Sequence, residues 1–166
     1  MTSLADRFRK WFEYEKDAHT QVLASLETVP EDRRREGGYQ KCLGWLAHLA
    51  AARALWLYRM GMAATGPSTH EELFPKDVSL QGARASLDAM HRAWQPYLAG
   101  LDDEALSRVF EYRAIEGDRF ENRVEDLLTQ LFGHSWYHRG QIASLVRELG
   151  GTPAETDYVF WTREGE

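Results

Sequence analysis

The chain has 166 residues, of which 43% are hydrophobic and 28% are charged, and its formal net charge is −6 at pH 7. This length and composition predict a single soluble domain, residues 1–166, with a core of its own. The acidic balance disfavours binding to DNA or RNA, because nothing in the overall charge attracts a phosphate backbone.

Cys42 is the only cysteine, which excludes an intramolecular disulfide and a metal site built from several cysteines. The N-terminal residues alternate apolar side chains with charges and lack the apolar stretch of a signal peptide. The longest weakly charged run, Cys42 to Ala52, is too short to span a bilayer. We therefore expect a cytoplasmic protein without a membrane segment.

The first predicted helix spans Leu4 to Leu26, where apolar residues recur at helical spacing. Ser3 and Asp6 resemble a capping box at its start, and Pro30 lies beyond its end. A second helix is predicted for Tyr39 to Met60. It is apolar on nearly all sides, which indicates a central position in a bundle or a dimer interface.

A loop is expected from Gly61 to about Ser79, followed by a third helix over Leu80 to Tyr97 that Pro96 should kink or end. Between Leu106 and Phe120 the apolar period changes to alternation, and the sequence Glu116-Gly117-Asp118 is typical of a turn. A short β-hairpin is therefore predicted before the last helix.

The fourth predicted helix spans Arg123 to Leu149, with Asn122 as its N-cap. Two glycines and Pro153 follow it and should end it. The aromatic tail from Asp157 to Trp161 is expected to fold back over the helices. The predicted fold class is thus all-α, a four-helix bundle with a short β-hairpin before its last helix.

The core face of the last helix includes two histidines at positions where aliphatic residues are expected. This face comprises Val124, Leu127, Leu131, His134, His138, Ile142, Leu145 and Leu149. The steps are all three or four residues, which is the spacing of one buried helical face. At positions i and i+4, His134 and His138 lie one turn apart on the same side, within reach of one metal ion.

His48 lies midway along the second helix, in the most apolar segment of the chain. Burying its ring there without a partner would cost about 1–3 kcal/mol. A hydrogen bond to a neighbouring side chain or to water would also satisfy it, and a single buried histidine is more often a hydrogen-bonded core residue than a ligand. A shared ion accounts for His48, His134 and His138 together, so we predict a metal site on these three residues.

The remaining histidines are weaker candidates. His19 lies near the apolar face of the first helix and could approach the site, although such residues are more often hydrogen-bonded at the edge of a core. His70 and His91 are expected to be solvated. Arg139 either pairs with a carboxylate inside the bundle or lies on the surface.

Two segments resemble the DinB-like family of bacterial four-helix proteins. The first is His134 to Trp161, HSWYHRGQIASLVRELGGTPAETDYVFW, which resembles the family's H-x-x-x-H-R-G-Q-I helix with its Gly-Pro stop and aromatic tail. The second is Gly44 to Gly61, GWLAHLAAARALWLYRMG, which is similar to the family's helix with one histidine. The order of the helices and the hairpin also fit, so the resemblance covers essentially the whole chain.

This resemblance implies a metal triad on His48, His134 and His138. It also implies an up-down-down-up bundle with a long connection between the second and third helices, and a homodimer, for which the second helix is a candidate interface. Where the family often has an acidic residue near the first triad histidine, this chain has Ala52 or Arg53. A carboxylate ligand or base from that region is therefore not expected.

Three neutral nitrogen ligands would leave at least one position of the ion open, which is typical of catalytic sites. No glutamate lies between His134 and His138, so the sequence identifies no general base and no catalytic residue. Tyr137, Arg139 and Gln141 are candidates only for groups surrounding the ligands.

Families that resemble this chain include transferases and isomerases that use low-molecular-weight thiols. We therefore expect a divalent-metal-dependent enzyme, a thiol-dependent transferase or a hydrolase, that acts on a small molecule. Nickel or zinc is favoured at nitrogen ligands, with iron or manganese as alternatives. The competing hypotheses are a non-catalytic, stress-associated homodimer with a structural ion, and a bundle that binds no metal.

Overall fold

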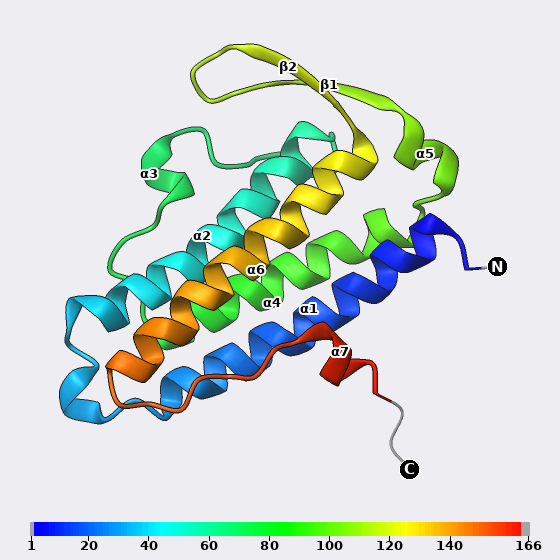
Figure 1. The fold of residues 1–166 in the computed structure, drawn as a ribbon. Helices are drawn as coiled ribbons and strands as arrows, with labels where there is room; N and C mark the ends of the chain where they lie inside the picture. The colour runs from blue at the N-terminus through cyan, green and yellow to red at the C-terminus, as the bar shows by residue number, and fades with distance from the viewer. Residues whose placement is uncertain (1, 164–166) are drawn as a thin grey trace.

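A computed structural model describes residues 2–163 of the chain. Its four long helices form an elongated bundle, shown in Figure 1: α1 (Leu4–Glu27), α2 (Gly37–Arg59), α4 (Leu80–Ala99) and α6 (Val124–Glu148). The smaller elements of these residues are the helices η1 (Glu31–Arg33), α3 (His70–Leu73), α5 (Asp103–Ser107) and α7 (Tyr158–Trp161), and the strands β1 (Val109–Arg113) and β2 (Arg119–Arg123).

The bundle has the predicted up-down-down-up topology. Helices α1 and α6 run in one direction and α2 and α4 in the other, with the long connection that contains α3 between α2 and α4 (Figure 1). Helix α2 packs against α4 and α6, and α1 packs against the same two helices. Consequently α1 and α2 occupy opposite corners of the bundle, so the predicted central position of α2 is wrong. Helix α3 also packs on α2, which is thereby covered on more than the two sides that face α4 and α6. The dimer interface stays a prediction.

The start of α1 and the end of α6 confirm the capping residues that the sequence predicts. The Ser3 hydroxyl accepts a hydrogen bond from the backbone N–H of Asp6 at 3.0 Å, and the Asp6 carboxylate accepts one from the backbone N–H of Ser3. Helix α6 ends where Gly150 takes a φ of 78°, a left-handed conformation that glycine adopts without a steric cost. The N–H of Gly151 then donates to the carbonyl of Val146 at 2.9 Å, which closes the helix.

Two predicted helix ends differ from the structure. Pro96 does not end α4, which continues to Ala99. The prediction that Asn122 caps the last helix is wrong, because Asn122 belongs to β2 and its side-chain oxygen accepts a hydrogen bond from the Tyr112 hydroxyl at 2.9 Å. The strand continues directly into α6, whose N-cap is Arg123. The N–H of Val124 instead donates to the carbonyl of Arg108 at 3.0 Å.

The β-hairpin is confirmed, but it begins and ends three residues later than predicted, at Val109 and Arg123. Its antiparallel register pairs Val109 with Arg123 at one end and Arg113 with Arg119 at the other. Gly117 lies in the predicted turn with a φ of 99°. Because a residue with a side chain is strained at that angle, glycine is the residue that the turn requires.

The core lies between the four long helices and includes Phe12, Leu26, Leu46, Trp94 and Ile142. None of the helices in residues 2–163 combines the length and apolar character that crossing a membrane requires.

The C-terminal segment folds back along the bundle, as predicted, and passes beside α1 and α6 (Figure 1). The Tyr14 hydroxyl donates to the carbonyl of Thr156. The Tyr14 ring also meets the rings of Tyr158 and Trp161 edge-on, at centroid distances of 5.0 and 5.7 Å. These contacts fix the tail on the side of α6 that faces α1.

Candidate metal centre

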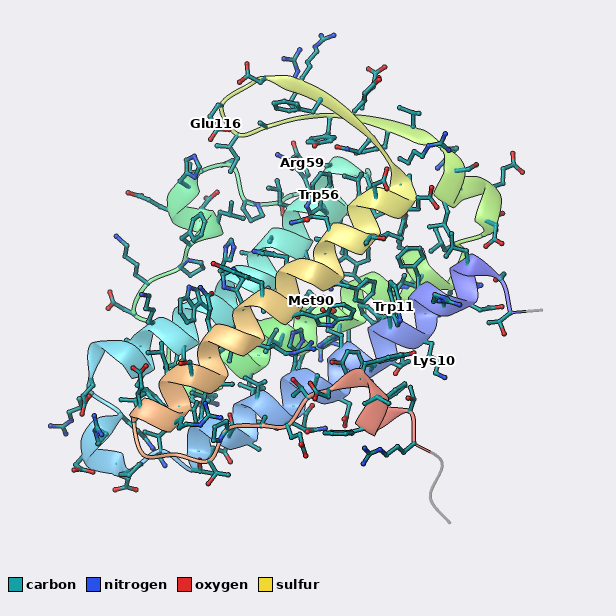
Figure 2. All side chains as sticks on the ribbon, in the orientation of Figure 1. Lys10, Trp11, Trp56, Arg59, Met90 and Glu116 are labelled. Carbon is teal, nitrogen blue, oxygen red and sulfur yellow. The ribbon has the colours of Figure 1, made fainter. Side chains whose placement is uncertain are left out.

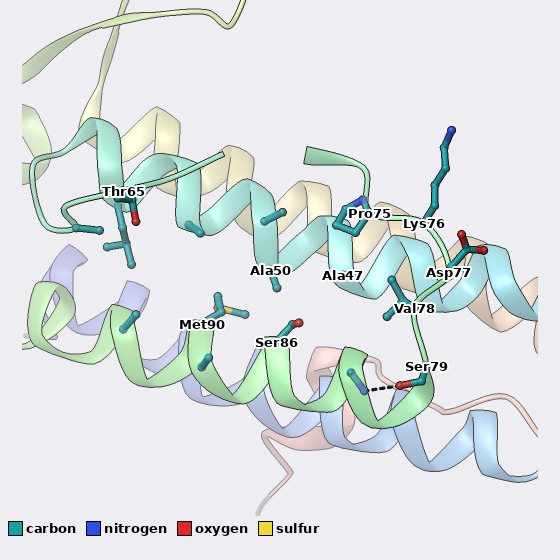
Figure 3. Close-up of a pocket in the computed structure, with 17 residues that line it drawn as sticks. Ala47, Ala50, Thr65, Pro75, Lys76, Asp77, Val78, Ser79, Ser86 and Met90 are labelled. Carbon is teal, nitrogen blue, oxygen red and sulfur yellow. Dashed lines mark hydrogen bonds between the residues drawn. The ribbon is translucent and has the colours of Figure 1, made fainter. Parts of the chain in front are cut away.

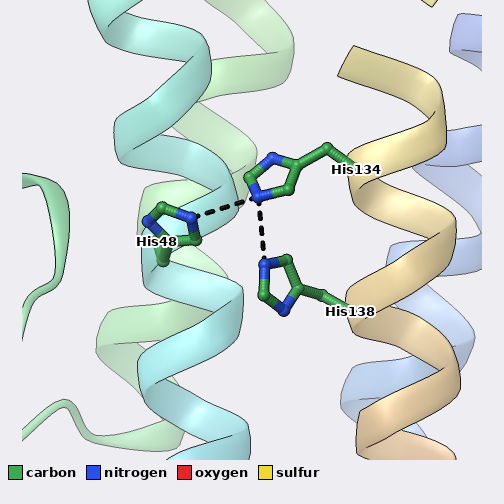
Figure 4. A group of neighbouring side chains, drawn as sticks. All are labelled: His48, His134 and His138. Carbon is green, nitrogen blue, oxygen red and sulfur yellow. Dashed lines mark hydrogen bonds between the residues drawn. The ribbon is translucent and has the colours of Figure 1, made fainter. Parts of the chain in front are cut away.

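The three predicted ligands converge between α2 and α6. His48 lies on α2, while His134 and His138 lie one turn apart on α6, and their rings point toward one another in Figure 4. One ring nitrogen of each lies within 4.8 Å of those of the other two. The Nε2 atom of His134 is 3.2 Å from that of His48 and 3.0 Å from that of His138. The geometry thus agrees with the predicted triad, while metal binding itself stays a prediction.

Hydrogen bonds on the far side of two rings determine which nitrogen faces the centre. The Nδ1 atom of His48 lies 2.7 Å from the carbonyl oxygen of Leu73, and Nδ1 of His138 lies 2.8 Å from Oε1 of Gln141. Both neighbours are acceptors, so each Nδ1 carries the proton and donates it. The Nε2 atoms of His48 and His138 therefore present lone pairs to the centre. Gln141 is one of the residues that the sequence suggested as surroundings of the ligands. Leu73 was not among them, because it belongs to the short helix α3, which was not predicted.

This arrangement leaves more lone pairs than protons at the centre. His134 has a single Nε2–H to offer, which can satisfy either His48 or His138. The Nε2 atom that is left over then accepts no hydrogen bond of its own, so one lone pair at the centre stays unsatisfied. A cation at the centre would satisfy all three nitrogens, so the donor set fits a transition metal ion that prefers imidazole.

Burial keeps the three rings neutral near pH 7. Desolvation lowers the pKa of His134 to about 4, with further contributions from His138 and His48. Burial also lowers the pKa of His48 and of His138, in part opposed by their hydrogen bonds to Leu73 and Gln141. Protons thus compete weakly for these nitrogens, which favours metal binding because a metal needs the neutral form.

Aromatic side chains surround two of the rings. The Phe74 ring stacks on His48 at a centroid distance of 4.2 Å and an interplanar angle of 8°. Trp45 and Tyr137 lie beside His138, at centroid distances of 5.7 and 5.3 Å. These contacts limit the rotation of both imidazoles and reduce the access of water on that side.

A cleft of about 320 Å³ opens on the triad from one side. It is bordered by α2, α3, α6 and residues 114–116 of the hairpin turn, and His48 and His134 lie on its wall whereas His138 does not. An ion held by the three nitrogens would therefore have an accessible position on the cleft side. Metal sites with such an open position can bind a further ligand, whereas structural sites are usually closed.

A larger cavity of about 620 Å³ lies between α2 and α4 and is drawn in Figure 3. Small apolar residues such as Ala47, Ala50 and Ala54 form its α2 wall, and Met90 lies on the α4 side. With about 100° of rotation per residue, these alanines lie on a different face of α2 from His48. The cavity contains none of the triad, so it is separate from the candidate centre.

A second polar cluster, which we call the interior network, lies between α1 and the triad helices. Two of its charged members, Glu15 of α1 and Arg53 of α2, form an ion pair across the diagonal of the bundle, with both side chains buried. Arg139 of α6 is also buried and donates to the hydroxyls of Tyr14 and Ser135. Arg139 is therefore not a surface residue, and it is not part of the triad.

Two histidines complete the interior network. Nδ1 of His19 lies 3.2 Å from Nε2 of His91, and Nε2 of His19 lies 3.0 Å from the hydroxyl of Ser135. The prediction that His91 is solvated is wrong, since it is only 4% exposed and faces the core of the bundle. His19 is hydrogen-bonded within the core and is not a fourth ligand of the triad. His70, by contrast, is exposed as expected and pairs with Glu116.

Sequence reasoning missed Glu15, although a signal for it exists. Phe8, Phe12, Glu15, His19 and Val22 follow one another at steps of three or four residues, so the carboxylate lies on the core face of α1. Likewise, Leu87, His91 and Trp94 share a face of α4. The periodicity could thus have located both polar residues, but not their partners on other helices.

Comparisons with known proteins agree with the fold. The DinB family model matches residues 1–165 of the chain. The protein DinB of Bacillus subtilis (strain 168) is 21% identical over 160 residues, which cover 93% of each protein. The crystal structure of a DinB-like protein from Bacillus cereus ATCC 10987 superposes with a TM-score of 0.60 at 21% identity, and the match covers 93% of this chain and 97% of that one. With a family match along nearly its whole length, the chain belongs to the DinB family.

Proposed function

We propose that the chain binds one divalent transition metal ion through the Nε2 atoms of His48, His134 and His138. The observation that carries this proposal is the convergence of three Nε2 atoms, two of which present lone pairs because their Nδ1 protons are engaged elsewhere. Nickel or zinc suits such a set of imidazoles best, and iron or manganese are the alternatives. No carboxylate of residues 2–163 joins this cluster.

We further propose that the metal site is catalytic and serves a thiol-dependent transferase or a hydrolase that acts on a small molecule. A bound divalent ion supplies Lewis-acid chemistry and activates water or a thiol as a nucleophile. The cleft beside His48 and His134 supports this proposal, because it leaves room for a substrate next to the ligands. Gln141 and the Leu73 carbonyl fix the orientation of two of the proposed ligand rings, those of His138 and His48.

The alternative is a non-catalytic homodimer, associated with stress, in which the ion only stabilises the bundle. The open cleft favours the catalytic proposal over this one, since structural sites are usually closed. The homodimer and the cytoplasmic location both stay predictions.

Metal content tests the triad directly. The chain purified without an affinity tag and analysed for elements should contain close to one transition metal ion per chain. His134→Ala and His138→Ala should each lose most of it. His70→Ala is the matched control, because His70 is exposed and bound to Glu116 rather than to the triad. Full metal content in the His134→Ala, His138→Ala double variant would refute the proposal.

Two further measurements separate the catalytic proposal from the structural one. Conjugation of thiols to electrophiles and hydrolysis of simple esters and amides should be screened with and without metal. The melting temperature of the metal-free chain should be compared with that of the loaded chain. Metal-dependent turnover with a small change in melting temperature supports an enzyme. A large loss of thermal stability without turnover supports a structural ion.

A further inference from the structure

The cleft beside the triad has a charged residue at its far end. Along α2 the wall of the cleft is formed by His48, Ala52, Trp56 and Arg59, at steps of four, four and three residues. Figure 2 shows Trp56 and Arg59 near the end of α2 and below the hairpin, with Glu116 at the hairpin turn. Arg59 and two residues of the triad, His48 and His134, thus border one continuous space.

Aromatic rings hold the Arg59 guanidinium in place without using its hydrogen-bond donors. Its central carbon lies 4.8 Å from the ring centre of Trp56 and 5.2 Å from that of Tyr112, and these two rings meet edge-on. Within residues 2–163 no group forms a hydrogen bond or ion pair with this guanidinium. Stacking engages the faces of the guanidinium, so its N–H edges stay available to an anion.

The negative charge of Glu116 acts on Arg59 through space but forms no ion pair with it within residues 2–163. Glu116 is the acidic residue of the wall, and its Oε1 is 2.7 Å from Nε2 of His70. The triad histidines are neutral ligands, so a divalent ion bound there would make the cleft positive as a whole. At the far end of the cleft Arg59 supplies one positive charge, which a ligand group with one negative charge would match. A dianionic phosphate fits it less well, because Glu116 would repel the second charge.

The length of the cleft sets the size of the ligand. Arg59 is eleven residues beyond His48, which corresponds to about 16 Å along a helix. The guanidinium stacks on Trp56, which is only eight residues beyond His48, so the gap between the guanidinium and the triad is shorter, about 12 Å. Ala52 leaves space directly beside His48. A volume of about 320 Å³ suits a small molecule with a chain of roughly six carbon atoms.

We propose that the cleft binds a small carboxylic acid, whose carboxylate is held by Arg59 and whose opposite, reactive end lies at the triad. This inference rests on the proposed function, since it places the reactive end at the metal site. It also names the substrate class: a small organic acid with a single negative charge near Arg59. Arg59 is here a substrate-binding residue that determines specificity.

Paired probes test the two ends of this ligand separately. The full chain loaded with cobalt is titrated with 6-mercaptohexanoate and with 6-mercaptohexan-1-ol, and sulfur-to-cobalt absorption reports the thiol end at the metal. The chain without added metal is titrated with hexanoate, hexan-1-ol and hexyl phosphate, and the indole N–H signal of Trp56 in NMR spectra reports the carboxylate end. Both titrations are repeated with Arg59→Gln. Arg119→Gln is the matched control. Arg119 is an exposed arginine of the hairpin whose turn borders the cleft, and its own side chain does not line the cleft.

In the wild type and in Arg119→Gln, each acid should bind about tenfold or more tightly than its alcohol. In Arg59→Gln this preference should fall to near one while alcohol binding is unchanged. Equal affinities in the wild type, or a preference that survives in Arg59→Gln, would overturn the inference, and so would tighter binding of hexyl phosphate than of hexanoate. If an Arg59-dependent preference for hexanoate appears but neither thiol changes the cobalt spectrum, the proposed metal chemistry fails and the carboxylate site stands.

Discussion

The ion pair between Glu15 and Arg53 crosses the middle of the bundle, and its removal tests how a polar interior is stabilised. The two side chains are 0% and 3% exposed. Around the Arg53 guanidinium lie the rings of Phe12, Trp94 and Phe132, with centroids 6.0, 5.8 and 5.1 Å from its central carbon. Water therefore cannot reach the Arg53 guanidinium to solvate it when the carboxylate is removed.

Removing one charge should cost more than removing both. Glu15→Gln keeps the shape of the side chain but leaves the guanidinium without a counter-charge, which should lower the free energy of unfolding by about 3–5 kcal/mol. Arg53→Met should cost less, because burial already raises the pKa of Glu15 and the carboxyl can bind a proton once Arg53 is gone. The double variant Glu15→Leu, Arg53→Met should lose less than Glu15→Gln, since no buried charge remains.

Urea unfolding of the full chain at pH 7, followed by tryptophan fluorescence and circular dichroism, measures these differences. Glu27→Gln is the matched control, because Glu27 forms an exposed ion pair with Arg84 at 2.8 Å that should contribute less than about 1 kcal/mol. The reasoning is refuted if Glu15→Gln costs no more than Glu27→Gln, or if the double variant loses the sum of the two single losses.

Three further predictions concern acid stability, metal affinity and the end of α6. Burial lowers the pKa of His91 to about 4, so between pH 6.5 and 4 the unfolded chain holds a proton that the folded chain does not. The free energy of unfolding should fall as the pH falls through this window, and His91→Leu should reduce that slope by up to one proton; an unchanged slope contradicts it. Gln141→Leu removes the acceptor for Nδ1 of His138 and should weaken metal affinity about 10- to 100-fold in chelator competition, with unchanged circular dichroism. Gly150→Ala places a side chain at a φ of 78° and should cost about 1–2 kcal/mol in urea unfolding, whereas an unchanged midpoint would contradict the strain argument.

The long helices could be predicted because each buries a repeating set of apolar positions. The hairpin could be predicted from its alternating residues and from the turn at Gly117, although no residue of either strand is fully buried. The short helices α3 and α5 could not, since helices of four and five residues present too few such positions. Both begin with a side-chain cap, in which Thr69 accepts from the N–H of Glu72 and Asp102 from that of Ala105. A cap alone is a weak signal, yet α3 supplies the Leu73 carbonyl that orients His48.

The triad was predictable because its two halves are visible along the sequence. His134 and His138 interrupt an aliphatic face, and His48 interrupts an apolar helix. The surroundings of the triad could not be predicted in the same way, because they depend on which helices are neighbours. The cleft needs Arg59 of α2 and residues 114–116 of the hairpin side by side, and only the packed bundle shows that.

The interior network and the triad occupy adjacent faces of α6, one residue apart. His134 and His138 face α2, while Ser135 and Arg139 follow each of them by one position and face α1. On α2, Arg53 lies little more than one turn beyond His48. The helical turns that carry the proposed metal ligands are therefore the same turns that carry residues of the interior network. Because a ligand set must keep its geometry to within about 0.5 Å, a loss of the ion pair should loosen the metal site as well as the fold.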